Sequence, residues 1–150
     1  MRAIWYEDFG PAKDVLVSGE KEAPLPSSGE VLVKVAYNGI NPVDVKRRAG
    51  GRGDMTDPYV IPHLDASGII EDVGESVDKS RIGERVWMFE TQWQTPHGAA
   101  AEYTCVPNSR AVHLPNNAGL DEGSCLGVPA LTAHRCVYGD GPVEGKIVLV

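Results

Sequence analysis

The chain has 150 residues, which is enough for roughly one domain. Its composition, 42% hydrophobic and 23% charged, excludes a disordered segment, and its net charge of −7 argues against a protein that binds a nucleic-acid backbone, because that class needs a dense basic face. No apolar run approaches the about 20 residues that cross a bilayer. The first ten residues include Glu7 and Asp8 and no long apolar stretch, so we expect neither a membrane partner nor a signal peptide.

The part of the chain before Pro115 consists of short β-branched or apolar runs separated by Gly and Pro. The clearest is residues 30–37, which is rich in valine and lies between Gly29 and Asn38-Gly39. Short strands at this spacing predict a mainly β fold, in the form of a closed or partly closed barrel with few helices. Residues 42–49 are expected to form a short helix, because Pro42 suits the first helical position. The other expected strands are residues 2–6, 14–18, 67–73, 85–89, 100–106 and 111–114.

After Pro115 the pattern changes to helical spacing. Apolar residues recur every three or four positions in residues 121–138, and Pro129 within this run predicts a break or kink. Gly139 and Pro142 end the helix, and residues 146–150 form an apolar run typical of a buried parallel strand.

The cysteines Cys105, Cys125 and Cys136 are few, odd in number and widely spaced. This usage favours reduced thiols in a cytoplasmic protein over a disulfide framework. Neither Cys105 nor Cys125 has a basic neighbour in sequence that would mark it as a nucleophile.

Several motifs in a fixed order resemble the N-terminal part of the medium-chain dehydrogenase/reductase superfamily, in its zinc-free quinone oxidoreductase branch. They are Gly39-Ile-Asn-Pro-Val-Asp44, Arg48-Ala-Gly50, Ile61-Pro-His-Leu-Asp-Ala-Ser-Gly68, Val73-Gly74, Ile82-Gly-Glu-Arg-Val86, Gly98-Ala-Ala-Ala-Glu-Tyr103, Leu126-Gly-Val-Pro-Ala-Leu-Thr-Ala133 and Gly145-Lys-Ile-Val-Leu-Val150. Each motif alone is weak, but together they cover nearly the whole chain.

The resemblance implies a GroES-like catalytic domain over residues 1–115. Residues 116–150 would then be the connecting helix and first strand of a dinucleotide-binding Rossmann domain. The family's glycine-rich phosphate loop follows that strand, so the sequence is expected to be truncated before the NAD(P)-binding loop. A chain of this kind should be inactive alone. Its apolar C-terminal run should promote homodimerisation or self-association through the tail.

The resemblance also bears on zinc, which many relatives use as a catalytic metal. At the positions that match the zinc ligands, this chain has Asn41, Leu64 and Leu126, none of which binds zinc usefully. We therefore expect no metal site.

In the absence of zinc, the enzyme must polarise its acceptor oxygen with hydrogen-bond donors. By resemblance, Asn41 and Asp44 are the candidate catalytic residues, and Asn41, Pro42, Val43 and Thr132 the candidate contacts to NADP or NAD. Three alternatives remain open from the residues alone. Asn41 could cap the short helix, Asp44 could be a solvated carboxylate, and Thr132 could bond back to a helix carbonyl.

The segment that follows these residues departs from the family pattern, in which aromatic hydroxyls often line the quinone pocket. Here the candidate substrate contacts are Lys46, Arg52, Tyr59 and Trp93. A cationic donor stabilises an oxyanion more strongly than a phenol does. The alternative is a solvated basic turn.

These observations favour the N-terminal portion of an NAD(P)H-dependent oxidoreductase that reduces quinones, enones or related carbonyl compounds by hydride transfer. The alternatives are a zinc-dependent alcohol dehydrogenase and a non-catalytic GroES-like binding or assembly module. The expected partner is a small carbonyl or quinone molecule.

Overall fold

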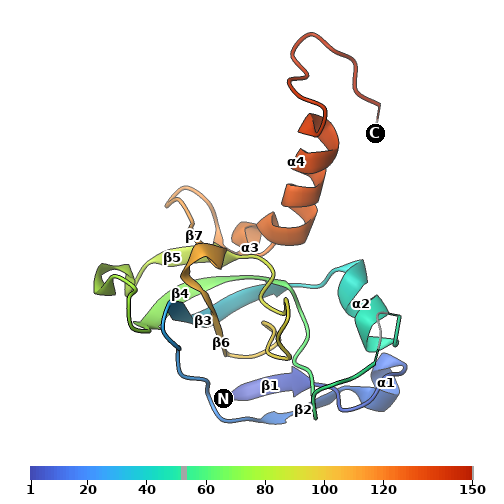
Figure 1. Cartoon of the computed structure of the whole chain (residues 1–150), viewed down its shortest axis with the longest axis vertical. Coiled ribbons are helices and arrows are strands. Elements are labelled where there is room, and N and C mark those ends of the chain that lie inside the picture. Colours follow the sequence, from blue (N-terminus) through green and yellow to red (C-terminus); the bar gives the residue numbers. More distant parts are fainter. Residues whose placement is uncertain (52–53, 150) are drawn as a thin grey trace.

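The computed structural model describes residues 1–51 and 54–149, and it confirms a mainly β fold with a curled, partly closed sheet (Figure 1). A small sheet pairs β1 (Arg2–Trp5) with β2 (Val17–Glu20). The larger sheet has the strand order β6-β3-β4-β5-β7, and every neighbouring pair in it is antiparallel. Its strands are β3 (Glu30–Gly39), β4 (Asp65–Val73), β5 (Arg85–Met88), β6 (Tyr103–Pro107) and β7 (Ala111–His113).

The helical elements are short. They are α1 (Ala12–Val15), α2 (Pro42–Arg48), α3 (Leu120–Gly123) and α4 (Leu131–Tyr138), with 3₁₀ turns η1 (Lys79–Arg81) and η2 (Asn108–Arg110) and a π-helical turn η3 (Leu126–Ala130). None of the helices in the described ranges is long and apolar enough to cross a membrane. Figure 1 shows α4 extending away from the curled sheet, with the C-terminal segment beyond it.

The hydrophobic core lies inside the curl of the larger sheet. Alternate residues of β3 and β6 point into it, so Val31, Val33 and Val106 have no exposed surface. Met88 at the end of β5 is equally buried. A second, smaller cluster joins Ala3 and Trp5 of β1 with Ile61 and Ala100. The period-two alternation that predicted the strands is therefore the alternation that builds the core.

The helix expected over residues 121–138 is interrupted as predicted. Pro129 lies within η3, which separates α3 from α4. Proline lacks an N–H and its ring obstructs the preceding turn, so a regular helix cannot run through it. Helix α3 packs on β3, β4 and β5, whereas α4 has no buried residue.

Three expected strands are wrong in whole or in part. Residues 12–15 form α1, which follows Pro11, and only the later part of the expected 14–18 strand belongs to β2. Residues 146–149 form no strand, because no other segment in the described ranges pairs with them, and residue 150 lies outside those ranges. Residues 100 and 101 lie before β6 and instead bridge β1, where the Ile4 N–H donates to Ala100 O at 2.8 Å.

Candidate functional site

The first turn of α2 brings together Asn41 and Asp44. Asn41 precedes the helix with an extended backbone, and Pro42 occupies its first turn, as the sequence predicts. The Asn41 backbone N–H donates to Asp44 Oδ2 at 2.7 Å, which is the return contact of a capping box. Both side chains are buried, at 5% and 4% exposure, so Asp44 is not the solvated carboxylate of the alternative interpretation.

The side-chain amide of Asn41 is held by a residue that the sequence analysis did not single out. Its Nδ2 donates to Asp65 Oδ2 at 2.8 Å. Asp65 is the first residue of β4 and has no exposed surface. The backbone N–H of Val128 in η3 donates to the same carboxylate, at 2.9 Å from each oxygen. Three segments that are distant in sequence thus meet at one buried carboxylate.

Two glycines permit this close approach. A Cβ at Gly127 would lie 2.1 Å from Asp65 Oδ1, and a Cβ at Gly39 would lie 2.6 Å from the carbonyl oxygen of Ser124. Because real side chains do not tolerate such distances, the packing of η3 against the start of β4 depends on Gly127, and the close approach of the C-terminal end of α3 to the end of β3 depends on Gly39.

The electrostatics of the site are dominated by burial. Desolvation raises the pKa of Asp44, against the hydrogen bond from the Asn41 backbone and the charge of Arg47, which lower it. Desolvation likewise raises the pKa of Asp65, and the hydrogen bonds from Asn41 and Val128 oppose it. Asp44 Oδ1 is buried without a hydrogen-bond partner in the described residues.

Asn41 offers one donor for chemistry. A primary amide carries two N–H groups. One is bonded to Asp65, and no other acceptor within the described ranges bonds to this nitrogen. The second N–H can donate to an oxygen that gains negative charge, which is the requirement for polarising a carbonyl.

Thr132 lies in the first turn of α4, on the other side of η3. It lines a cavity of about 250 Å³ together with Phe89, Gly127 and Val128. The side chain of Thr132 is exposed. The Val128 N–H connects this cavity to Asp65 and hence to Asn41.

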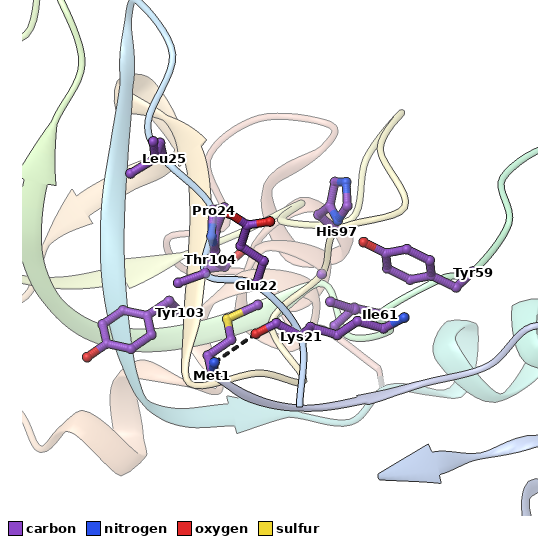
Figure 2. Close-up of a pocket in the computed structure, with 12 residues that line it drawn as sticks. Met1, Lys21, Glu22, Pro24, Leu25, Tyr59, Ile61, His97, Tyr103 and Thr104 are labelled. Atoms are coloured by element: carbon purple, nitrogen blue, oxygen red, sulfur yellow. Dashed lines mark hydrogen bonds between the residues drawn. The ribbon is translucent and has the colours of Figure 1, made fainter. Parts of the chain in front are cut away.

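The three candidate substrate residues that the structure describes lie on different segments. Lys46 is exposed on α2, Trp93 is 43% exposed, and Arg52 lies outside the described residues. Tyr59 lines a separate cavity of about 370 Å³ with Lys21 and His97 (Figure 2). Lys21 Nζ lies 3.9 Å from the Tyr59 ring centroid. Lys46, Tyr59 and Trp93 share no described cavity with Asp44 or Thr132, and the roles of all four candidates stay predictions.

A polar cavity of about 390 Å³ beside α2 was missed by the sequence analysis. It is lined by Tyr6, Arg47 and Gln92, among others. The Arg47 guanidinium donates to the backbone oxygen of Gln92 at 3.3 Å, and burial raises the pKa of Tyr6. The basic run at residues 46–48 indicated a cation in this region, but the sequence did not indicate which of the three residues lines a cavity.

Neither the cysteines nor the residue types that bind metals form another candidate site in the described residues. The three thiols are free, and burial raises the pKa of Cys105 to about 12, which makes it a poor nucleophile. Across residues 1–51 and 54–149, no group of three His, Cys, Asp or Glu side chains is placed to hold a metal ion.

A comparison of the sequence with known protein families identifies the domain that carries this site. Residues 27–116 match the alcohol dehydrogenase GroES-like domain. The chain belongs to this family. Its curated relatives in the medium-chain dehydrogenase/reductase superfamily include quinone oxidoreductases and a synaptic vesicle membrane protein VAT-1 homolog-like protein. The quinone oxidoreductase from Lama guanicoe is 35% identical over 151 residues, which cover all of this chain and 44% of the relative. The GroES-like chain thus spans less than half the length of the relatives it matches.

Solved structures give the same assignment. The quinone oxidoreductase from Coxiella burnetii superposes with a TM-score of 0.82 at 26% identity, covering 91% of this chain and 44% of the other. A mycobacterial protein whose structure was determined with NADPH superposes with a TM-score of 0.80 at 25% identity, covering 95% and 41%. The GroES-like fold predicted from the sequence is therefore confirmed.

Proposed function

We propose that this chain is the catalytic N-terminal portion of an NAD(P)H-dependent oxidoreductase that reduces quinones, enones or related carbonyl compounds without zinc. The observation that carries the proposal is the Asn41 amide. It is buried, it is fixed at 2.8 Å from Asp65, and it has one N–H left to donate. The names of the relatives support quinones as acceptors.

The described residues fit the reactive end of a nicotinamide. The exposed hydroxyl of Thr132 can bond a carboxamide in the cavity beside Val128, and the Asn41 amide is tied to the same turn through Asp65. A bound nicotinamide would supply the hydride. Asn41 donates its second N–H to the acceptor oxygen and stabilises the charge that develops there. Pro42 and Val43 are proposed to contact the cofactor from the first turn of α2.

The cavity beside α2 is proposed to receive the remainder of the acceptor. Arg47 supplies a cation at its wall, and no carboxylate of the described residues lies within ion-pair distance of it. Tyr6 and Gln92 add further polar groups to this wall. The carboxylates of Asp54 and Asp57 also line this cavity, so its wall carries both signs of charge and suits a polar acceptor better than a purely hydrocarbon one.

The proposal is tested by joining residues 1–150 to the cofactor-binding half of the Lama guanicoe relative. The joined protein should oxidise NADPH in the presence of 1,4-naphthoquinone, whereas the 150-residue chain alone should not. Asn41→Ala should lower kcat of the joined protein by roughly 100-fold, the usual cost of losing one oxyanion donor.

Asn117→Ala, at an exposed asparagine outside the site, is the matched control and should leave kcat unchanged. A folded joined protein that binds NADPH but reduces no quinone would overturn the proposal. So would an Asn41→Ala variant with undiminished turnover.

A further inference from the structure

Asp65 is a carboxylate in a position that otherwise suits an apolar residue. It begins a run of four fully buried residues in β4, and it has no exposed surface. No Lys, Arg or His of the described residues lies within ion-pair distance of it. A buried charge without a cation is costly, and hydrogen bonds alone must compensate for it. Stability therefore does not explain why an acid stands here.

The hydrogen bonds of Asp65 do explain it. The carboxylate accepts from two groups on different segments, Asn41 Nδ2 and the Val128 backbone N–H. An ionised carboxylate is acceptor-only, so it can serve both donors at once. Oδ2 accepts from both donors and Oδ1 from the Val128 N–H alone. An asparagine amide of the same shape would place an N–H at one of the two oxygen positions and lose at least one of these three contacts, so the full set of contacts favours an acid here.

The contact with Asp65 also decides which way the Asn41 amide faces. An amide can rotate by half a turn and exchange its oxygen for its nitrogen. Rotated in that way, Asn41 would direct Oδ1 at Asp65 and lose the bond, since two oxygen acceptors repel each other. The carboxylate therefore keeps Nδ2, and with it the second N–H, in place.

We propose that Asp65 is a positioning residue: it orients the Asn41 amide as a donor and ties it to the η3 turn that leads to Thr132. This inference rests on the proposed function, because it assigns the amide a donor role. Gly127 supports the arrangement, since its missing Cβ leaves the space that the Asp65 carboxylate occupies. Asp65 acts through Asn41 and Val128 and is not itself in contact with the reacting atoms.

The hydrogen-bond network can be tested by NMR spectroscopy on the 150-residue chain. In the native protein, a scalar coupling across the hydrogen bond should connect Asn41 Nδ2 with the Asp65 carboxyl carbon. In Asp65→Asn, the Asn41 side-chain signals should move toward those of solvent-exposed asparagines and exchange faster with water. Asp72→Asn is the matched control, because it makes the same change at an exposed position of the same strand.

Absence of the coupling in the native chain would overturn the proposal, and this measurement does not depend on the variant folding. Unchanged Asn41 signals in a folded Asp65→Asn chain would overturn it as well. In the joined protein, Asp65→Asn should lower kcat by roughly tenfold, as loss of a supporting contact typically does, with KM for NADPH unchanged. If Asn41→Ala impairs turnover and Asp65→Asn does not, the positioning role of Asp65 is wrong and the proposed function stands. If Asn41→Ala has no effect, the proposed function fails.

Discussion

Asp44 has a carboxyl group whose two oxygens differ in their surroundings. Oδ2 accepts a hydrogen bond from the Asn41 backbone, whereas Oδ1 is buried without a partner in the described residues. Burial raises the pKa of this carboxyl above its ordinary value of 3.8. The folded protein therefore binds a proton at Asp44 more tightly than the unfolded chain does, and ionisation of Asp44 costs stability.

The sign of the resulting pH dependence follows from linkage. Between the ordinary pKa and the raised one, the folded state carries more protons than the unfolded state, so stability falls as pH rises. Asp44→Asn removes this contribution. We expect the free energy of unfolding of the native protein, relative to that of the variant, to decrease as the pH rises from the ordinary pKa of 3.8 toward the raised pKa of the folded state.

Urea unfolding at several pH values measures this difference. Asp14→Asn, at an exposed position, controls for the loss of one negative charge. A native protein that gains stability relative to Asp44→Asn as pH rises would show that the folded structure favours the ionised carboxyl, contrary to the expectation.

At this scale the sequence predicted local relations and missed distant ones. Asn41 and Asp44 are three residues apart beside a helix-starting proline, so their proximity follows from helical geometry. Asp65 lies 24 residues from Asn41, and their contact depends on where β4 begins after the intervening loop. Tyr59 is close to α2 in sequence but lines a different cavity from the one that contains Asp44, and its contact with substrate stays a prediction. Only tertiary structure supplies that information.

Among the elements, β4 shows most directly that side chains on one face of a strand are buried while their neighbours on the other face are exposed. Ile69 and Ile70 are adjacent and chemically identical, but Ile69 is 39% exposed while Ile70 has no exposed surface. The two side chains project from opposite faces of the strand. Ile70 packs in the main core cluster.

This pair provides an internally controlled test of the core. Ile70→Ala should lower the free energy of unfolding by about 2–5 kcal/mol, through lost burial and the cavity left behind. Ile69→Ala should cost less than about 1 kcal/mol, because much of this side chain remains in water in the folded state. Denaturant unfolding of both variants measures the contrast, and equal costs would contradict the orientation of β4.

The elements also show where local patterns are insufficient. Residues 146–149 have the composition of a buried strand, but a strand needs a neighbour to accept and donate its backbone hydrogen bonds, and no described segment provides one. Residues 30–37 have a similar composition and do form a strand, because β4 and β6 lie on either side of β3. The difference between these two segments lies in their partners and not in their sequences.

For the molecule as a whole, the most unusual surface is the apolar C-terminal region. Ile147 and Leu149 are almost completely exposed, and Leu131 and Tyr138 on α4 are about half exposed, at 46% and 49%. These side chains lie on α4 and the segment after it, which extend away from the sheet (Figure 1). Clustered apolar surface of this kind favours association, since contact with a second surface removes it from water.

We therefore expect the 150-residue chain to associate with itself through this region, so that its mass by light scattering increases with protein concentration. The double variant Ile147→Asp/Leu149→Asp should shift the distribution toward the monomer, because each charge would have to be buried in the contact. Leu25→Asp is the matched control. Leu25 is 84% exposed, but it lies outside the C-terminal region, at the cavity that contains Tyr59. The control should associate as the native chain does. A native chain that stays monomeric over a wide concentration range, or a Leu25→Asp variant that dissociates equally, would show that the C-terminal region is not the contact.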